Sequence, residues 1–442
     1  MPLTEPIVAI ATPPGRGAVG IIRLSGSDLQ QVANQVIGSL PPPRVATLRG
    51  IRSNNETIDH ALVIYFQAPR SFTGEQVIEI QAHGGITLMQ EVLKICVAAG
   101  ARIARPGEFT ERAFLNGKLD LIQAEAIADL IESTSMRAAR LALNSLSGKF
   151  SREVNEISAE LKNIRIQTEA TIDFPEDDLP SNVIVELTSK LAAAAKTIER
   201  MLANADRGAR LNSGVDIAIV GAPNVGKSTL LNVLAGDDKA IVTDVPGTTR
   251  DILSVDINLD GLAVRIHDTA GLRETSNVIE QEGVRRAKEK ISQVDAILYI
   301  VDGEDDSLAP LVRRASVETF TIRNKIDLDG LLPRLEQKTD GPYIQLSAKR
   351  NLGIDLLRSA LLNHFGLGAD SENIVLARQR HLDALSRALD ALSFDYASLC
   401  YDAPELSAER LRLACNALAE LTGEYTSEDL LGDIFSTFCI GK

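Results

Sequence analysis

Short apolar runs alternate with turn-rich segments over the first third of the chain. The runs IVAIA (7–11) and VGIIRL (19–24) flank TPPGRGA, and the runs ALVIYF (61–66) and VIEIQA (77–82) flank QAPRSFTGEQ. Apolar runs that are joined by segments containing Gly and Pro are typical of hairpins. We therefore predict a mixed α/β domain over residues 1–118 that is built on hairpins and not on a parallel Rossmann sheet.

A helical pattern replaces this alternation at residue 119 and continues to residue 210. The stretch LDLIQAEAIADLIESTSMRAARLALNSL keeps apolar residues at helical spacing over many turns and contains no Gly or Pro. The same pattern returns in residues 369–442, where one stripe contains Leu382, Leu385, Leu389 and Leu392. We expect long helices in both regions.

Between the helical regions, residues 211–368 alternate short apolar strands with helical segments. This order predicts a doubly wound, mostly parallel sheet that helices cover on both faces. An α/β module bracketed by two similar helical regions suggests an insertion into one helical domain, because the two ends of a domain often lie close together. The alternative is that the two helical regions are unrelated. The predicted strands are VDIAIV, LAVRIHD, AILYIVD, TFTIRNK and YIQLSA.

Length and charge narrow the class of protein. A chain of 442 residues is too long for one core and predicts two or three domains. The net charge of −14 argues against a polybasic nucleic-acid binder, although residues 1–118 alone carry 11 basic and 9 acidic side chains. The N-terminus has no signal-peptide pattern, no apolar run reaches membrane-spanning length, and the four cysteines lack metal-ligand spacing. We expect a soluble cytoplasmic protein.

A phosphate-binding motif, GAPNVGKST (221–229), directly follows the strand VDIAIV. Its glycines let backbone N–H groups face phosphates, Lys227 reaches the β- and γ-phosphates, and Ser228 offers a hydroxyl to Mg²⁺. In the later motif DTAG, Asp268 can hold Mg²⁺ through water. Thr249, which lies between the two motifs in TDVPGTTRD, can complete the metal shell.

Two further motifs specify the base. In NKID (324–327), Asp327 can accept hydrogen bonds from the ring N–H and the exocyclic amine of guanine, an edge that adenine lacks. SAK (347–349) supplies backbone donors, so the four motifs in this order predict a GTP site. Its expected residues are Asn224, Val225, Gly226, Lys227, Ser228, Thr229, Thr243, Asp244, Val245, Pro246, Gly247, Thr248, Thr249, Asp268, Thr269, Ala270, Gly271, Asn324, Lys325, Asp327, Ser347, Ala348 and Lys349.

Leu272 occupies the position after DTAG where Ras-like GTPases carry the glutamine that orients the attacking water. A leucine side chain cannot orient water. Three carboxylates follow, and any of them could accept a hydrogen bond from the water, so the pattern does not choose among them. They are Glu274, Glu280 and Glu282.

Asn224 lies inside the phosphate loop, where its side-chain oxygen could ligate a monovalent cation beside the phosphates. Thr243, Val245 and Thr248 could complete the shell of that cation, which would then take the place of an arginine finger. The alternative is that Asn224 fills a position of the motif that tolerates many residue types.

Motifs from every region of the chain occur in an order that identifies a family. ATPPGRGAVGIIRLSG, FTGEQVIEIQAHGG and PGEFTERAFLNGKLDLIQAEAIADLI are followed by the phosphate loop with its asparagine, TDVPGTTRD, DTAGLRE and the terminal FCIGK. Together they resemble the MnmE (TrmE) family of tRNA-modification GTPases, from about residue 5 to residue 442. The resemblance implies a Ras-like P-loop GTPase (G) domain that is inserted into a helical domain, and an N-terminal α/β domain that binds folate and forms a homodimer.

The resemblance also implies roles for particular residues. The family's catalytic glutamate falls on Glu280, and Cys439 in the terminal motif is a candidate catalytic thiol, although free cysteines are more often packed or inert. The expected metal ligands are Ser228 and Thr249 for Mg²⁺, and Asn224, Thr243, Val245 and Thr248 for K⁺. The residues expected to bind 5-formyl-tetrahydrofolate, an analogue of a tetrahydrofolate one-carbon donor, are Arg23, Glu79, Lys118 and Lys442.

The function that this resemblance implies is a potassium-stimulated GTPase that works with an FAD-dependent partner of the MnmG (GidA) family. Together they would add an aminomethyl or carboxymethylaminomethyl group to the wobble uridine of certain tRNAs. The tRNA would contact mainly the partner. A switch GTPase of ribosome assembly, similar to the Era or Der families, is the alternative. The motifs between residues 215 and 350 fit it equally well, but the long N-terminal domain and FCIGK oppose it.

Overall fold

The computed structural model divides the chain into two compact units. The first unit joins residues 1–131 to residues 145–194 and 387–442, and the second joins residues 132–144 to residues 195–386. Within its described part, the chain has no helix that is long and apolar enough to cross a membrane. The described residues are 5–53, 56–133, 136–173, 181–236, 254–259, 262–268, 294–303, 317–366, 377–424, 428–436, 438 and 441.

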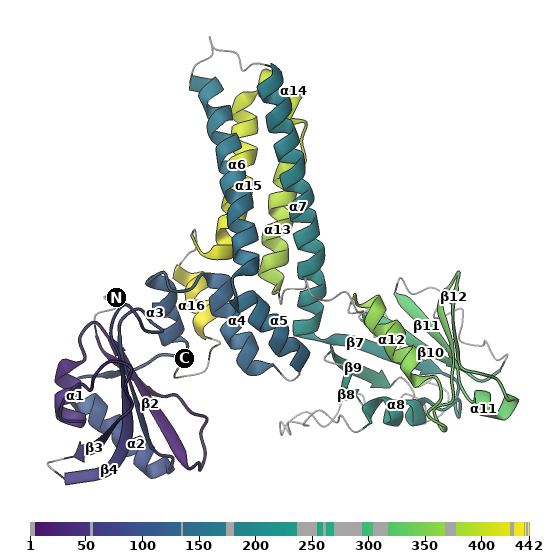
Figure 1. Ribbon diagram of the computed structural model, residues 1–442. Coiled ribbons are helices and arrows are strands. Elements are labelled where there is room, and N and C mark those ends of the chain that lie inside the picture. The colour runs from purple at the N-terminus through teal and green to yellow at the C-terminus, as the bar shows by residue number, and fades with distance from the viewer. Residues whose placement is uncertain are drawn as a thin grey trace, which may run out of the picture. The chain divides into compact units, whose positions relative to one another are not determined.

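The N-terminal domain contains a six-stranded sheet (Figure 1), with β1 (Ile7–Ile10), β2 (Val19–Gly26), β3 (Thr47–Ser53), β4 (Glu56–Phe66), β5 (Gln76–His83) and β6 (Arg102–Ile103). Their order across the sheet is β3-β4-β5-β2-β1-β6. The predicted hairpins are confirmed, because β1 is antiparallel to β2 and β4 is antiparallel to β5. The last strand, β6, is parallel to β1.

The two faces of this sheet have different coverings. Ile22 and Ile80 point into a hydrophobic core with α1 (Gln30–Val36) and α2 (Ile86–Ala98). Because successive residues of a strand point to opposite faces, Arg23 of β2 and Glu79 of β5 lie on the other face. There α3 (Glu108–Leu115) packs through Phe109 against Ile7 and Ala9.

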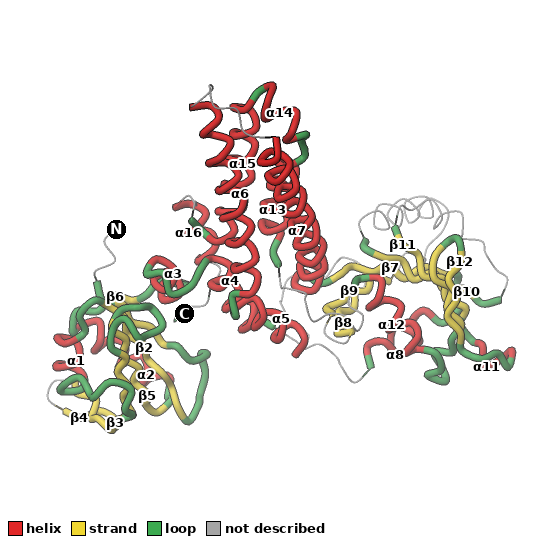
Figure 2. The backbone as a smooth tube through the Cα atoms, turned by 45° about the horizontal axis from the view of Figure 1, so that its top comes forward, coloured by secondary structure: helices red, strands yellow, loops and turns green. Residues whose placement is uncertain are grey.

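Long helices form both predicted helical regions. In the first unit, α6 packs along α15, so segments from either side of the G domain are neighbours, as an insertion requires (Figure 2). The predicted domain boundaries stay predictions, since the compact units divide the chain at other residues. The helices are α4 (Leu121–Glu132), α5 (Met136–Leu146), α6 (Lys149–Asp173), α7 (Ser181–Ser213), α13 (Gln379–Leu392), α14 (Tyr396–Asp402), α15 (Pro404–Thr422) and α16 (Glu428–Ser436).

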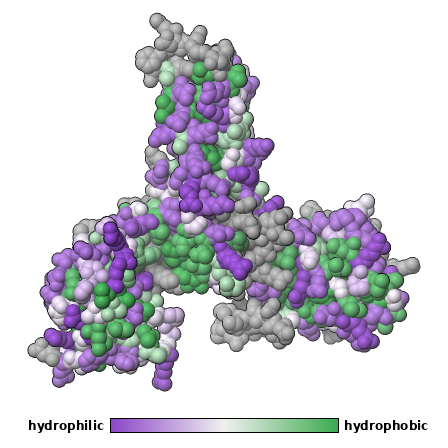
Figure 3. Space-filling model, viewed as in Figure 1, coloured by the Kyte–Doolittle hydropathy of each residue, from purple (hydrophilic) through white to green (hydrophobic). Residues whose placement is uncertain are grey.

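The packed helices α6 and α15, called here the helical stack, have apolar stripes that face inward. Leu161 of α6 and Leu411 and Leu418 of α15 are completely buried. Hydrophilic residues cover much of the stack on the face shown in Figure 3. Thr168 of α6 also shares a buried hydrogen bond of 2.7 Å with the hydroxyl of Tyr396, which fixes α14 against α6.

The second unit contains a seven-stranded sheet in the order β12-β13-β11-β10-β7-β9-β8. Five neighbouring strands are parallel, which confirms the predicted sheet, and the edge strands β8 and β12 are antiparallel. The sequence prediction missed both edges, and β12 reads RLEQK, with no apolar run to mark it. The strands are β7 (Val215–Gly221), β8 (Ser254–Leu259), β9 (Leu262–Asp268), β10 (Ala296–Val301), β11 (Glu318–Arg323), β12 (Arg334–Lys338) and β13 (Gly341–Gln345).

In the described part of the second unit, three helices accompany this sheet. They are α8 (Lys227–Ala235), α11 (Ile326–Asp329) and α12 (Ile354–His364). α8 packs on β7 and β8, and α12 packs on β12 and β13. Each of the three begins at or close to the carboxyl end of a parallel strand, as is usual in doubly wound sheets.

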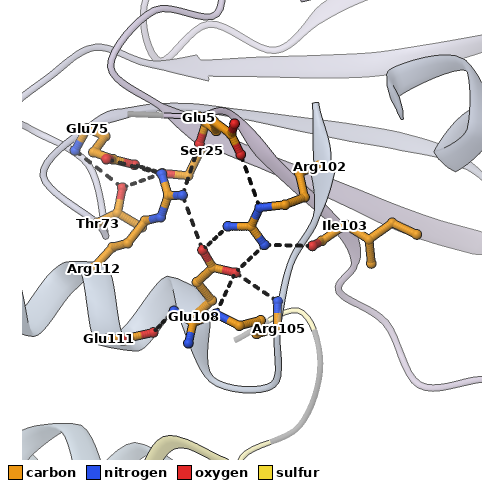
Figure 4. Close-up of polar contacts among 10 residues, drawn as sticks. All are labelled: Glu5, Ser25, Thr73, Glu75, Arg102, Ile103, Arg105, Glu108, Glu111 and Arg112. Atoms are coloured by element: carbon orange, nitrogen blue, oxygen red, sulfur yellow. Dashed lines mark hydrogen bonds and ion pairs between the residues drawn. The ribbon is translucent and has the colours of Figure 1, made fainter. Parts of the chain in front are cut away.

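A buried charge cluster fixes α3 to the N-terminal sheet (Figure 4). Glu108 is fully buried and accepts hydrogen bonds from Arg102 at 2.6 and 3.0 Å, from the Arg105 N–H at 2.8 Å and from Arg112 at 3.2 Å. Arg112, which is 1% exposed, also donates to both carboxylate oxygens of Glu75 at 3.0 and 3.2 Å. Glu108 and Arg112 are one helical turn apart, so α3 presents both charges to the sheet.

The ionisation of Glu108 follows from these contacts. Burial raises its pKa, but the hydrogen bonds from Arg102, the Arg105 N–H and Arg112, together with the charge of Arg102, outweigh burial and lower the pKa below its usual value. A lowered pKa means that the contribution of Glu108 to stability is complete above the unfolded value of about 4.3. That contribution is lost as the pH falls through the folded value.

We predict that Glu108→Gln loosens α3, because it removes the buried carboxylate that Arg102 and the buried Arg112 share, although Arg112 keeps its pair with Glu75. Breaking such a buried pair costs about 3 kcal/mol, which corresponds to about 100-fold faster amide exchange. Hydrogen-exchange mass spectrometry of peptides covering residues 108–115 measures the effect. Glu111→Gln is the matched control, since Glu111 pairs with the exposed Arg105 and should change exchange only slightly. Equal exchange in the two variants would contradict a structural role for Glu108.

Candidate functional site

The phosphate loop joins β7 to α8 in the second unit. Lys227 is buried and donates to the carbonyl oxygens of Gly221 and Ala222 at 2.9 and 2.8 Å, so its ammonium group lies across the loop. Gly226 has φ +101°, and a Cβ there would collide with the Asn324 amide nitrogen. Only glycine fits this position, as a backbone that closely approaches its neighbours requires.

Asn224 has an exposed side chain and a left-handed backbone with φ 63°. Asparagine tolerates this conformation better than most residues, which gives a structural reason for its presence. Its side chain is nevertheless free to face a ligand. The conformation is therefore compatible with both hypotheses for this residue, and the cation site stays a prediction.

One asparagine connects the phosphate loop to the base-binding motifs. The Asn324 amide donates to the Val225 carbonyl at 2.8 Å and accepts from the Ala348 N–H at 3.0 Å. Both bonds are buried, so losing either partner would leave a buried polar group unsatisfied. The structure thus brings together parts of three predicted motifs, GAPNVGKST, NKID and SAK.

Asp327 and Lys325 extend this arrangement. The Ser347 hydroxyl donates to Asp327 at 2.5 Å, and this bond, with the charges of Arg350 and Lys349, lowers the pKa of Asp327. Asp327 is therefore a carboxylate at neutral pH and can accept from two N–H groups of a base. Lys325 pairs with Asp302, which follows β10, at 2.5 Å.

These motifs share one edge of the sheet. The phosphate loop follows β7, Asp302 follows β10, NKID follows β11 and SAK follows β13. All four strands are parallel, so the motifs meet at the carboxyl edge, where ligands of doubly wound folds bind. Ser228 and Thr229 are exposed in the first turn of α8, which suits a hydroxyl ligand of Mg²⁺ and an anion at a helix N-terminus.

The switch side of the predicted site is described only at Asp268, whose backbone ends β9 beside β7. The other predicted residues of this side lie outside the described residues, as does the catalytic candidate Glu280. Their roles stay predictions. They are Thr243, Asp244, Val245, Pro246, Gly247, Thr248, Thr249, Thr269, Ala270 and Gly271.

In the first unit, Arg23 and Glu79 are cross-strand partners of β2 and β5. The Arg23 guanidinium lies 2.8 and 3.0 Å from Oε1 of Glu79 and 5.9 Å from the centre of the Phe109 ring. Both contacts to Glu79 use Oε1, which leaves Oε2 to accept from a ligand N–H. The two side chains are about one-fifth exposed, at 21% and 18%, so they are accessible.

The C-terminal tail reaches the same pair. Arg23 donates to the Gly441 carbonyl at 3.2 Å, and a Cβ on Gly441 would come within 2.6 Å of the Ile10 carbonyl oxygen. Gly441 has φ +97°, so both its conformation and its close approach to β1 require glycine. Cys439 and Lys442 lie outside the described residues.

Lys118 lies in the segment that follows α3. Its ammonium donates to the Pro69 carbonyl at 3.2 Å, in the loop that joins β4 to β5. Of the four predicted folate residues, the structure thus brings Arg23 and Glu79 into contact and places Lys118 on a neighbouring loop.

Comparisons with known proteins cover the whole chain. A family model described as the MnmE helical domain matches residues 121–439, and one described as the GTP-binding protein TrmE N-terminus matches residues 6–118. The chain is 50% identical to a protein named tRNA modification GTPase MnmE from Azoarcus sp. (strain BH72), over 99% of this chain and 98% of that protein. It is 47% identical to the protein of the same name from Nitrosomonas europaea, over 100% of both chains.

The chain belongs to the MnmE family. This membership confirms the family resemblance, and it rests on sequence matches that include the N-terminal third as well as the G domain. Among solved structures, the G domain of the T. maritima FeoB iron transporter covers 34% of this chain at 20% identity, with a TM-score of 0.26. A likeness of that size supports no inference about function.

Sequence motifs did not reveal every residue of the nucleotide site and of the Arg23–Glu79 site in this MnmE family member. Asp302, the partner of Lys325, stands in an unremarkable VDG sequence, and only its position after a buried strand hints at a role. Phe109 and the Gly441 carbonyl contact Arg23 across large sequence separations. No local pattern could have shown either contact.

We predict that Asp327→Ala weakens GDP binding at least about tenfold, because hydrogen bonds to a charged acceptor contribute about 1.5–3 kcal/mol. Isothermal titration calorimetry with GDP measures the change. Asp329→Ala in the same short helix is the matched control, since Asp329 pairs with Arg323 and should leave affinity within about twofold. If both variants bind GDP as tightly as the parent protein, Asp327 does not recognise the base.

Proposed function

We propose that this chain hydrolyses GTP and uses it in the modification of tRNA. The observation that carries the proposal is the match over nearly the whole chain to proteins named tRNA modification GTPase MnmE. It is supported by the hydrogen bonds of Asn324, which connect the phosphate loop to the SAK motif at one edge of the sheet. The modification would be an aminomethyl or carboxymethylaminomethyl group on the wobble uridine of certain tRNAs. A tetrahydrofolate derivative would supply the carbon, and an FAD-dependent protein of the MnmG (GidA) family would be the partner.

In GTP hydrolysis, Lys227 would bind the β- and γ-phosphates, while Ser228 and Thr249 would hold Mg²⁺. Asp327 would select guanine. The side chain of Glu280 would orient the attacking water, which Leu272 cannot do. Asn224, with Thr243, Val245 and Thr248, would hold K⁺, which supplies positive charge to the phosphates where other GTPases use an arginine finger.

The N-terminal site would bind the folate. Glu79 supports this role, because its Oε2 can accept from the amide and amine edge of a pterin, which resembles that of guanine. Arg23 holds Glu79 in place and lies against the C-terminal tail. Lys118 and Lys442 would attract the carboxylates of the ligand's glutamate tail, and Cys439 stays a candidate catalytic thiol.

The proposed assembly is a homodimer formed through the N-terminal domain, bound to the MnmG-type partner. The tRNA would contact mainly that partner, in keeping with the net charge of −14 of this chain. An Era- or Der-like switch GTPase is not favoured, because relatives match the N-terminal domain and the C-terminal helices as well as the G domain.

We expect K⁺ to stimulate GTP hydrolysis by the purified protein strongly over Na⁺ at equal ionic strength, and Glu280→Ala to abolish the stimulated rate. Steady-state release of phosphate measures both effects. A lost arginine finger costs about 10³-fold or more, so the expected difference between the salts is large. Glu274→Ala and Glu282→Ala are the controls. Equal slow rates in both salts would refute the cation site, and a normal rate in Glu280→Ala would move the water-orienting role to another carboxylate.

Glu79→Gln is predicted to weaken binding of 5-formyl-tetrahydrofolate at least about tenfold, since it replaces a charged acceptor with an amide. Equilibrium dialysis gives the dissociation constants. The control is Glu91→Gln in α2, which covers the opposite face of the sheet. Unchanged affinity in Glu79→Gln would remove this residue from the site.

A further inference from the structure

Three cations gather at the loop formed by residues 67–75, which joins β4 to β5. The Lys118 ammonium donates to the Pro69 carbonyl at 3.2 Å, and the Arg44 guanidinium donates to the next carbonyl, that of Arg70, at 2.5 Å. The third cation is the exposed side chain of Arg70 itself. Two successive carbonyls therefore hold two positive groups beside a third.

Arg44 is held in this place at an energetic cost. Its backbone is left-handed, with φ 61°, which is disfavoured for a residue with a long side chain. The strand environment enforces the conformation, because the Arg44 N–H donates to the Tyr65 carbonyl at 2.8 Å. The guanidinium then stacks 5.5 Å from the centre of the Phe66 ring. The Arg44 side chain is therefore fixed at this loop by its contacts with the Arg70 carbonyl and the Phe66 ring.

These cations have no acidic partner within the described part of the domain. No carboxylate of residues 5–53 or 56–133 forms an ion pair with Arg44, Arg70 or Lys118. The two acids nearest to Arg70 along the chain are already occupied, since Glu75 pairs with Arg112 and Glu79 pairs with Arg23. The cluster is thus an exposed, uncompensated positive surface on a protein with net charge −14.

The cluster is continuous with the proposed folate site. Phe66 is opposite Val77 in the β4–β5 pairing, and Val77 is two residues from Glu79 on the same strand. Residues two apart share a face, so Phe66 is a diagonal neighbour of Glu79, at a spacing that long side chains can bridge. Arg44 on the Phe66 ring therefore faces the same side of the sheet as Arg23 and Glu79.

We infer that the Arg44–Arg70–Lys118 cluster binds the γ-linked glutamate chain of a polyglutamylated folate, and that this site prefers that form to the monoglutamate. The inference rests on the proposed folate function and deepens it. A ligand whose ring lies at Glu79 and whose first carboxylate meets Lys118 would carry further carboxylates past Arg70 and Arg44. Guanidinium groups suit these carboxylates because each can form two parallel hydrogen bonds to one of them.

Equilibrium dialysis with 5-formyl-tetrahydrofolate as the monoglutamate and as the pentaglutamate tests this. We expect the full-length protein to bind the pentaglutamate about tenfold tighter at low salt, since each exposed ion pair contributes modestly. This difference in affinity should shrink as NaCl screens the attraction between the exposed cations and the ligand carboxylates. Arg70→Ala should remove most of the advantage and leave monoglutamate affinity unchanged, and Arg44→Ala should act in the same direction. Lys94→Ala, on α2 and therefore on the opposite face, is the matched control.

The possible outcomes separate the inference from the function on which it rests. Equal binding of the two ligands by the parent protein overturns the inference and leaves the folate site intact. No binding of either ligand overturns both. The inference is also overturned if Arg70→Ala and Arg44→Ala still bind the pentaglutamate more tightly than the monoglutamate. It is overturned as well if Lys94→Ala loses this preference to the same extent as the arginine variants. If the two arginine variants lose affinity for tRNA and keep the pentaglutamate advantage, the cluster binds RNA phosphates instead.

Discussion

A carboxylate in the interior, that of Glu108, holds together the part of the protein on which the folate proposal depends. It neutralises Arg102 and Arg112 and caps the Arg105 N–H, which fixes α3 to the sheet. Two results follow from the position of α3. Phe109 lies beneath the Arg23 guanidinium, and Gly107, just before the helix, lies so close to Phe435 and Phe438 that a Cβ there would meet both.

The C-terminal tail is therefore a structural part of the N-terminal site. Phe435 and Phe438 pack with Leu121 and Ala128 of α4, which anchors the end of the chain to the helical region. Gly441 then delivers its carbonyl to Arg23. One residue of the terminal motif FCIGK, Gly441, thus contacts the Arg23–Glu79 pair through Arg23.

Sequence motifs located the phosphate loop after β7 because the physics there is local. Phosphates are bound by backbone N–H groups and a helix N-terminus within one short segment, so GAPNVGKST is enough to locate them. Hairpins in the N-terminal domain were also predictable from apolar runs and turn residues. The cluster around Glu108 was not, because its charges come from Glu5, Glu75, Arg102 and Arg112, and each alone reads as a surface residue. Arg44 escaped notice for the same reason, since its left-handed backbone depends on pairing with Tyr65.

The central claim is that a nucleotide site and a folate site in one chain serve a single tRNA-modification reaction. Mass spectrometry of tRNA nucleosides tests it most directly, in cells whose only copy of this protein is Lys227→Ala, Glu79→Gln or the control Lys94→Ala. The account predicts loss of the modified wobble uridine in the first two and full modification in the control. Full modification in Glu79→Gln would show that the N-terminal site does not take part in the reaction. Full modification in Lys227→Ala would show that GTP binding does not.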